Sequence, residues 1–589
     1  MISFLKLFSK KDFVVFGFLY LGLVVYSFFE IFSIALIPAF VQLIIDPQKI
    51  NEFYYHPWLA GYLTKENLSN LILIGSVIII TVFLIKNLFL IIVTYLYETK
   101  TSNWLSNLTH NFIKRVLDLS YENFIMADHA KLTNIVINEF ETIRHVIRTY
   151  FILLKELLVL ILVCISFIYI SPFYFMILFT SMVFFSLIFF FFLRNVLKTS
   201  GSKSQELKGA QIKVMDVVFR GIKYIKIFDK SKYFSNFLFN LTKKRNRIAA
   251  NIASIQILPK LLIEIILLLL FLITCNLLFN IFEGASSDQF IITLSLIAVM
   301  VVRLIPIYTN LNVSFIFLKF ASPAIKSITN YFKDKAIEDL ENPFENSKTF
   351  DEKFESIELK NINYKFKTKT TSAFSIENIN FTLRRGEKVG VIGNTGSGKS
   401  TLINCVLGLL KPDEGDIIFN KQDSIFLNIK SWQKKISFVP QDIFLMDSNI
   451  YQNISLSHEV TDEEIIKIND IIKLTKLDKF LNNFDLNLGD KTAKISEGEK
   501  QRVGVCRALF KSCEVLILDE TTSSLDVNTE KEIMTNLKEQ FKEMTILTIA
   551  HRLSTVEDYD KIILMKNGKS IMIDDPKTVI KFFIEDKIN

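Results

Sequence analysis

The chain has 589 residues, of which 50% are hydrophobic and 22% charged, and its formal net charge is +8. Its 55 phenylalanines exclude a disordered chain, and the lack of a strongly basic block interleaved with aromatics argues against nucleic-acid binding. The five cysteines form no C-x-x-C pair, so neither a disulfide framework nor a zinc site is expected. Apolar residues crowd into residues 1–325, which predicts two parts of different kind.

Six apolar runs in the N-terminal part are each long enough to cross roughly 30 Å of hydrocarbon. A bilayer offers backbone groups no water, so these runs are predicted to be helices; a water-soluble helical core is the disfavoured alternative. The runs are Phe13–Leu43, Leu71–Tyr97, Ile147–Ile170, Phe173–Leu193, Pro259–Phe282 and Phe290–Phe320. We therefore predict a membrane-embedded, all-α six-helix bundle over residues 1–325, a linker over 326–349 and a second domain over 350–589.

The distribution of lysine and arginine predicts the orientation. The two connections that follow the second and fourth runs are long, rich in basic residues and helical in spacing, whereas the other side offers only Lys49 and Lys65. Positive charge stays on the cytoplasmic side, so both long connections and both termini are predicted to be cytoplasmic. Each connection is expected to fold back near its middle, around Tyr121–Ala130 and Ile222–Lys230.

The outer connection Asp46–Asn70 is unusual because it is rich in aromatic residues. Aromatics at the water boundary commonly form a belt that anchors helices. A short external helix that contacts a lipid-like substrate is the alternative, and both interpretations stay open.

From about Phe350 onward, short apolar strands alternate with helical stretches. A strand-like run, Lys388–Ile392, leads into a match to the phosphate-binding loop G-x-x-x-x-G-K-[ST]. Its residues are Gly393, Asn394, Thr395, Gly396, Ser397, Gly398, Lys399, Ser400 and Thr401. The glycines allow backbone N–H groups to surround phosphate oxygens at a helix N-terminus. Lys399 is predicted to reach the β- and γ-phosphates, and Ser400 to bind Mg²⁺.

A second strand, Val515–Leu518, is apolar throughout and ends in two carboxylates, Asp519 and Glu520. A fully apolar strand is typical of a parallel sheet that is covered on both faces. Asp519 is predicted to hold Mg²⁺ and Glu520 to polarise an attacking water. A helix-capping turn is the structural alternative for such a pair.

In this order the motifs resemble the ATP-binding cassette (ABC) transporters, and the resemblance covers nearly the whole chain. It implies an exporter-type membrane bundle followed by an α/β P-loop nucleotide-binding domain, with ATP and Mg²⁺ as cofactors. It also implies that Gln441 contacts Mg²⁺ and water, that His551 contacts the γ-phosphate, and that both act with Glu520 in catalysis. Phe366 is implied to stack on adenine, and Asp526 to communicate across a dimer.

The signature segment departs from the LSGGQ of the family and reads Ile495, Ser496, Glu497, Gly498 and Glu499. Its serine and glycine are kept and are implied to contact the γ-phosphate of a nucleotide. The two glutamates add negative charge near an anionic ligand, which is unfavourable unless they point away. Lys500 and Arg502 lie nearby and are expected to offset this charge.

One cassette in each chain implies that two chains pair around ATP, as a homodimer or with a different partner. The segment Arg303–Pro306 and the aromatic outer connection resemble the exporter branch that flips pyrophosphate-linked lipid oligosaccharides across the bacterial inner membrane. This resemblance implies that Arg303 contacts the pyrophosphate. Independently of it, an intramembrane arginine is costly and is therefore a functional candidate. Pairing of Arg303 with Glu30 or Glu264 is the structural alternative.

Other functions stay open to different degrees. An exporter of drugs, peptides or other lipids is the main alternative, and a gated channel that uses ATP is another. Cassette ATPases of DNA repair or translation lack membrane spans, so the apolar runs argue against them.

Overall fold

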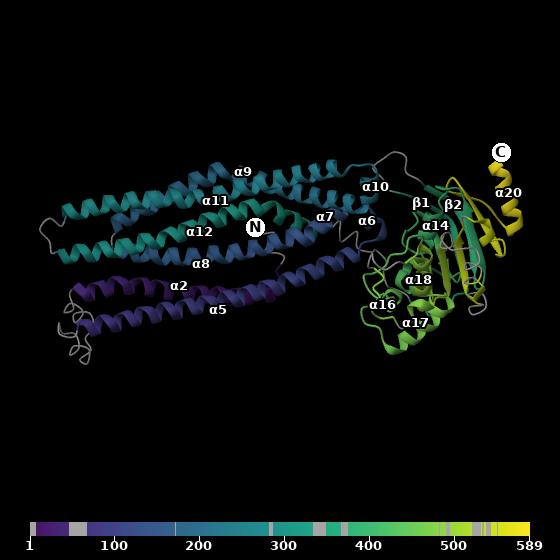
Figure 1. Cartoon of the computed structure of the whole chain (residues 1–589), viewed down its shortest axis with the longest axis horizontal. Coiled ribbons are helices and arrows are strands. Elements are labelled where there is room, and N and C mark those ends of the chain that lie inside the picture. Colours follow the sequence, from purple (N-terminus) through teal and green to yellow (C-terminus); the bar gives the residue numbers. More distant parts are fainter. Residues whose placement is uncertain are drawn as a thin grey trace. The chain divides into compact units, whose positions relative to one another are not determined.

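The chain forms two compact units in the computed structural model (Figure 1). Met1–Leu119 and Met126–Asp339 make up the first unit, and Ser120–Ile125 and Leu340–Asn589 the second. The structure describes residues 8–45, 68–170, 172–281, 287–333, 349–366, 375–481, 483–489, 495–520, 532, 535–536, 543–550 and 552–588. Most of the aromatic outer connection lies outside these residues, so its role stays a prediction.

Long helices lie side by side in the first unit (Figure 1). In the described part of the chain they are α2 (Lys10–Ile45), α5 (Leu68–Leu117), α8 (Phe140–Ile170), α9 (Pro172–Arg220), α11 (Ser231–Ile281) and α12 (Ser287–Lys333). Each of the six predicted apolar runs falls on one of these helices, which confirms the helical bundle.

Three of these helices continue well beyond their apolar runs. The helix α5 extends to Leu117, α9 extends to Arg220, and α11 begins at Ser231. Short helices lie where the chain is expected to fold back. They are α6 (Tyr121–Met126), α7 (His129–Asn134) and α10 (Ile222–Ile227), and the π-helical segment Ile135–Glu139 joins α7 to α8.

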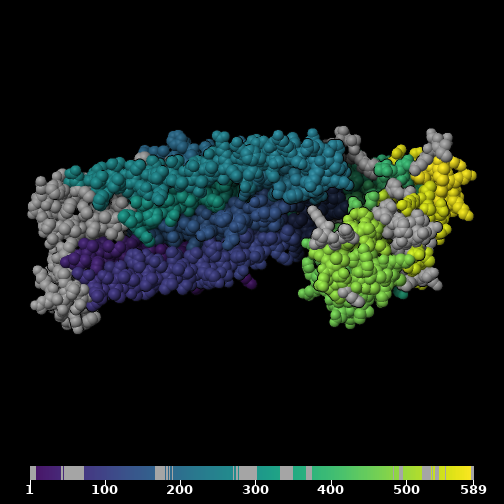
Figure 2. All heavy atoms as spheres, viewed as in Figure 1, coloured from purple at the N-terminus to yellow at the C-terminus, as the bar shows by residue number. Residues whose placement is uncertain are grey.

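The outer surface of the bundle is apolar. Within the described residues, four stretches are long and apolar enough to cross a membrane, namely Lys10–Val41, Ile72–Leu117, Ser231–Ile273 and Val302–Tyr331. Figure 2 shows α5 and α11 on the outside of the unit, where both expose large aliphatic side chains such as Leu73, Ile91, Ile265 and Leu272. A surface of this kind is stable against lipid tails and unstable against water.

Inside the bundle, aromatic packing and close backbone approach hold the helices together. Tyr97 of α5 is fully buried, stacks on Phe151 of α8 at 3.9 Å and donates its hydroxyl hydrogen to the carbonyl of Ile147 at 2.6 Å. A Cβ on Gly201 of α9 would lie only 2.0 Å from the carbonyl oxygen of Phe320 in α12. Glycine therefore permits the contact between α9 and α12.

The second unit contains two sheets. A six-stranded, mostly parallel sheet has the order β10-β9-β3-β8-β7-β6, and a four-stranded antiparallel sheet has the order β2-β1-β4-β5. The strands are β1 (Ser356–Lys365), β2 (Ser375–Arg384), β3 (Lys388–Gly393), β4 (Glu414–Phe419), β5 (Asp423–Ser424), β6 (Ile436–Val439), β7 (Val515–Asp519), β8 (Thr545–Ile549), β9 (Lys561–Lys566) and β10 (Lys569–Asp574). Apart from Asp519, every residue of β7 is buried, as expected for a covered parallel strand.

Helices complete this unit. They are α14 (Lys399–Val406), α15 (Ile429–Lys435), α16 (Ile450–Ser455), α17 (Asp462–Leu474), α18 (Glu497–Phe510) and α20 (Pro576–Ile588). One hydrophobic core joins α14, α15 and strands of both sheets. At its centre Trp432 is fully buried and donates its indole N–H to the carbonyl of Val406 at 2.8 Å. This core fixes the helix that follows the phosphate-binding loop.

Replacing Gly201 by alanine should destabilise the first unit. The added Cβ would overlap the Phe320 carbonyl, and overpacking of this kind costs about 1–3 kcal/mol. Gly209→Ala is the matched control, because Gly209 lies in the same helix and has no atom within 4 Å of a Cβ. We expect a lower thermal midpoint for Gly201→Ala only, measured as the folded fraction recovered by size-exclusion chromatography after heating. Equal midpoints would contradict the assigned contact.

Candidate functional site

The phosphate-binding loop connects β3 to α14. Gly393, the last residue of β3, has a φ of 152°, and a Cβ there would lie 2.2 Å from the carbonyl oxygen of Met565 in β9. Gly396 and Gly398 have φ values of 80° and 107°, which favour glycine strongly. Ser400 is exposed at the start of α14, and the hydroxyl of Ser397 is buried with no hydrogen-bond partner in the described part of the chain. The loop therefore has the backbone conformation that the motif requires.

The side chain of Lys399 lies over this loop. Its ammonium group donates to the carbonyl oxygens of Gly393 at 2.8 Å and Asn394 at 3.1 Å, and the residue is only 6% exposed. Burial lowers the pKa of Lys399 below its ordinary value, while the negative charges of Glu520 and Asp519 act in the opposite direction. A phosphate group would supply further negative charge to this buried cation.

The parallel strands bring the predicted catalytic residues to one edge. β8 pairs in parallel with both β3 and β7, and β7 pairs in parallel with β6. The residues that follow these strands therefore lie at the same edge of the sheet. There Gln441, which follows β6, donates its amide N–H to Glu520 Oε2 at 2.9 Å. The structure thus joins Gln441 and Glu520 across 79 positions of the sequence.

Glu520 has a left-handed backbone, with a φ of 51°. This conformation costs a non-glycine residue about 1–2 kcal/mol and is concentrated at functional sites. Its backbone N–H donates to the carbonyl oxygen of Ile549 at 3.2 Å, which ties the turn to the end of β8. The residues that directly follow Glu520 lie outside the described part of the chain, so the helix-capping alternative for this pair stays open.

Three other predicted nucleotide contacts stay predictions. Phe366 follows β1, is half-buried and packs edge-on against Tyr364 at 5.1 Å between ring centroids. Its contact with adenine stays a prediction. Asp526 and His551 lie outside the described residues, so their predicted roles also stay predictions.

The signature segment begins α18. The hydroxyl oxygen of Ser496 accepts a hydrogen bond from the backbone N–H of Glu499 at 3.2 Å, and the carboxylate of Glu499 accepts one from the N–H of Ser496 at 2.8 Å. Gly498 lies between them in the first turn. This reciprocal pair is a capping box, which satisfies two donors at a helix N-terminus.

Both signature glutamates have cationic partners. Glu499 is ion-paired with Lys479, and Arg502 lies 4.0 Å away. Burial acts to raise the pKa of Glu499, but the hydrogen bonds from Lys479 and Ser496 outweigh it, and the pKa lies below that of an ordinary glutamate. Glu497 is ion-paired with Lys500 at 2.6 Å, and its side chain is 72% exposed. The expected neutralisation by Lys500 and Arg502 is therefore observed, with Lys479 as an additional partner.

A cluster of charges lies inside the membrane unit. Glu30 of α2 is fully buried and pairs with Lys86 of α5 at 3.0 Å and with Arg303 of α12. On α8, Lys155 pairs with Glu156 at 3.0 Å, and Asn310 of α12 donates to the same carboxylate at 2.8 Å. These groups line a cavity of about 370 Å³, in which the described lining residues carry three cations and two carboxylates. We name it the charged cavity.

The position of Arg303 agrees with the structural alternative that pairs it with Glu30. Glu264 instead pairs with Lys260 of its own helix at 3.7 Å. Lys86, Lys155 and Glu156 belong to no sequence motif that would mark them as site residues. Charge inside a membrane is nevertheless itself a signal of function.

Comparison with known proteins identifies the second unit. Residues 376–523 match the family model described as ABC transporter. This segment is therefore similar to an ABC transporter domain. It contains the phosphate loop, Gln441, the signature segment, Asp519 and Glu520, and its match supports ATP binding.

Curated relatives match parts of the chain. The iron–sulfur clusters transporter of mitochondria from Oryzias latipes is 36% identical over 196 residues, which is 33% of this chain and 26% of that protein. A vacuolar heme ABC transmembrane exporter of Schizosaccharomyces pombe is 30% identical over 219 residues, or 37% and 15%. A beta-(1→2)glucan export ATP-binding/permease protein of Agrobacterium vitis is 31% identical over 217 residues, or 36% and 37%. The chain thus covers well under half of the length of these relatives.

The fold of the whole chain has a solved counterpart. The structure of a bacterial Atm1-family ABC exporter with ATP bound matches with a TM-score of 0.78, over 95% of this chain and 96% of that one, at 17% sequence identity. The chain therefore has the fold of an ABC exporter, with a helical transmembrane domain followed by an α/β nucleotide-binding domain.

The residues at the edge of the sheet suit Mg²⁺. Ser400 presents an exposed hydroxyl at the start of α14, and Asp519 and Gln441 bring carboxylate and amide oxygens to the same edge. Oxygen ligands of this kind are those that Mg²⁺ prefers when it is bound with phosphates. When bound, the ion would neutralise phosphate charge between these three side chains.

Replacing Glu520 by glutamine should abolish ATP hydrolysis and preserve ATP binding. The amide keeps the size of the side chain and its contact with Gln441 but cannot accept a proton, so turnover should fall by about 10²-fold or more. Release of phosphate and binding of a fluorescent ATP analogue give the two readouts. Glu543→Gln, at an exposed position of the same domain, is the control and should keep full turnover. Undiminished hydrolysis in Glu520→Gln would exclude the assigned role.

Replacing Glu499 by glutamine should cost stability in a pH-dependent way. Glutamine can complete the capping box, but it loses the ion pair with Lys479. Because the folded state depresses the pKa of Glu499, the carboxylate stabilises the domain above its unfolded pKa and this contribution disappears as the pH falls through the folded pKa. The difference in thermal midpoint between wild type and Glu499→Gln should therefore be largest near pH 7 and should shrink as the pH falls below the ordinary pKa of a glutamate, about 4.3.

A change in tryptophan fluorescence, to which the buried Trp432 contributes, reports unfolding of this domain at each pH. Glu497→Gln is the control two residues earlier, and its exposed side chain predicts a small difference at every pH. A difference for Glu499→Gln that stays constant with pH would contradict the assigned ion pair.

Proposed function

We propose that the protein is an ATP-driven exporter that works as a homodimer and flips a pyrophosphate-linked lipid oligosaccharide across the bacterial inner membrane. The proposed domains are a transmembrane domain at 1–325, a linker at 326–349 and a cassette at 350–589. Both termini and the cassette face the cytoplasm. The hydrogen bond between Gln441 and Glu520 beside the phosphate-binding loop carries the ATPase part of the proposal.

In this mechanism ATP binds between two copies of the domain. The phosphate loop and Lys399 of one copy hold the triphosphate, and Phe366 stacks on adenine. Ser496 and Gly498 of the second copy contact the γ-phosphate, so the nucleotide favours the closed pair. A ligand that binds one state only shifts a two-state equilibrium toward that state.

Hydrolysis resets the cycle. Glu520 polarises the attacking water, which Gln441 helps to hold, and His551 contacts the γ-phosphate. Asp526 communicates between the two copies. Loss of the γ-phosphate removes the contacts that bridge them, so the pair opens and the membrane helices return to their first arrangement.

The charged cavity supports an anionic substrate group. Its described lining residues carry one more positive than negative charge, and they lie within helices whose outer surface is apolar. Arg303 already has Glu30 as a partner, so a pyrophosphate would compete for it or share it with that carboxylate. Guanidinium groups bind phosphates through paired hydrogen bonds, which makes such sharing favourable.

Export of drugs, peptides or other lipids is the alternative. The names of the relatives mention iron–sulfur clusters, heme and a glucan, and these substrates have little chemistry in common. The names therefore favour no single substrate class.

Replacing Arg303 by alanine should slow flipping of a lipid-linked oligosaccharide by about tenfold or more, the equivalent of one lost charge-assisted hydrogen bond. Proteoliposomes with a fluorescent lipid-linked sugar measure flipping, and basal ATP hydrolysis should change little. Lys260→Ala is the control, since Lys260 is an exposed cation of α11.

Because Arg303→Ala leaves Glu30 with Lys86 alone, a second variant combines Arg303→Gln with Glu30→Gln and removes both charges. Both variants should flip slowly if the arginine binds substrate. Flipping at the wild-type rate in a folded variant would favour the alternative exporter.

A further inference from the structure

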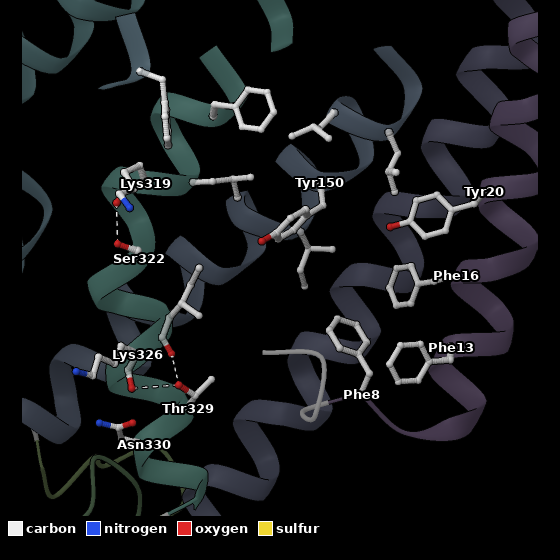
Figure 3. Close-up of a pocket in the computed structure, with 17 residues that line it drawn as sticks. Phe8, Phe13, Phe16, Tyr20, Tyr150, Lys319, Ser322, Lys326, Thr329 and Asn330 are labelled. Atoms are coloured by element: carbon white, nitrogen blue, oxygen red, sulfur yellow. Dashed lines mark hydrogen bonds between the residues drawn. The ribbon is translucent and has the colours of Figure 1, made fainter. Parts of the chain in front are cut away.

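A second cavity of the membrane unit has one aromatic wall and one polar wall (Figure 3). Its volume is about 900 Å³, within the range of ligand pockets. The aromatic wall consists of Phe8, Phe13, Phe16 and Tyr20, which come from the first turns of α2 and from the position two residues before it. The opposite wall is α12, which contributes Lys319, Ser322, Lys326, Thr329 and Asn330, and Tyr150 of α8 lies between the two walls. We name it the amphipathic cavity.

Several apolar side chains that line this cavity are exposed. Phe13 is 49% exposed, Phe315 of α12 is 45% exposed, and Leu154 of α8 is 37% exposed. Contiguous apolar surface of this kind usually marks a site that another molecule covers. The cavity therefore offers room and contact for a hydrocarbon chain.

The charges of this cavity are all positive. Among the described residues that line it are Lys319 and Lys326 but no aspartate or glutamate. Neither lysine forms an ion pair with a carboxylate of the described residues, and seven positions separate them, so they lie about two turns apart on one face of α12. The hydroxyls of Ser322 and Thr329 already donate to backbone carbonyls of α12 and leave their oxygens as weak acceptors only. The wall thus lacks an anionic partner.

We infer that the amphipathic cavity binds an amphiphile with an anionic headgroup. The hydrocarbon chain lies along Phe13, Phe315 and Leu154, and the headgroup binds Lys319 and Lys326. The inference rests on the proposed function, because it makes the cavity the place where a lipid substrate is taken up from the cytoplasmic leaflet. In the proposed orientation, the start of α2 and the end of α12 both lie on that side.

Charge complementarity separates this occupant from others. A neutral or zwitterionic lipid would cover the aromatic wall but leave both ammonium groups without a net counter-charge. An apolar segment of a second copy would bury the two lysines unpaired, which is strongly unfavourable. An anionic amphiphile satisfies both walls at once.

Photolabelling of the purified full chain in neutral detergent tests the inference. The probe is phosphatidylglycerol with a diazirine in one acyl chain, compared with phosphatidylcholine that carries the same chain. Peptide mass spectrometry should locate adducts on residues 13–20, 150–154 and 315–330. We expect about tenfold more labelling by the anionic probe, as a difference of one charge-assisted contact predicts.

Combined replacement Lys319→Ala and Lys326→Ala should bring the ratio of the two probes close to one, and Lys319→Arg with Lys326→Arg should restore it. Lys198→Ala with Lys203→Ala is the control, since these lysines are exposed on α9, outside the lining of the cavity, and carry the same total charge. Circular dichroism checks that each variant folds. Equal labelling by both probes, a ratio that falls in the control as well, or cross-links between two copies in place of lipid adducts would each overturn the inference.

The ATP readouts keep the two proposals separate. If wild-type protein hydrolyses ATP and flips the labelled sugar lipid while the probes show no preference, only the amphipathic cavity is excluded. If the anionic probe labels the cavity selectively while wild-type protein hydrolyses no ATP, the proposed function is excluded and the binding site stands.

Discussion

Parallel strand pairing is the constraint on which the nucleotide site depends. Leu518 pairs with Val439 and Asp519 pairs with Ile549, so the ends of β6, β7 and β8 are level with one another. Val391 of β3 pairs with Ile549 as well. The strand register therefore places residues far apart in the sequence at one edge of the sheet. A slip of one residue in β7 would turn Asp519 to the other face of the sheet.

The unusual sequence at the start of α18 stabilises the first turn of this helix. Glu499 occupies the position at which a capping box places a glutamate or glutamine, so the departure from the family pattern there keeps the helix start intact. Its charge is also favourable near the positive end of the helix dipole and is paired with Lys479. Glu497 is the larger departure, because it replaces a glycine of the family with an exposed carboxylate held only by Lys500.

Local features of this chain could be predicted from sequence, whereas contacts between distant segments could not. The apolar runs predict the helices because hydrocarbon thickness determines their length. The phosphate-binding loop is predictable because its glycines and lysine lie within one short stretch of the sequence. The pattern Ser496-x-x-Glu499 is also a local signal for a capping box, which the charge of Glu499 alone does not reveal. The pairing of Glu30 with Lys86 needs the packing of α2 against α5, which no local pattern specifies.

The helix α12 lines both the charged cavity and the amphipathic cavity. Arg303 lines the charged cavity, and Lys319 lines the amphipathic cavity 16 residues later, which corresponds to about 24 Å along a helix. Phe190 of α9 and Phe315 of α12 line both the amphipathic cavity and a third, almost wholly apolar pocket beside it. An amphiphile could therefore keep its chain on aromatic and aliphatic surface while its headgroup exchanged the lysines for Arg303. Such a path offers the anionic group a cation at each of its two ends, which would lower the energetic cost of moving it across a membrane.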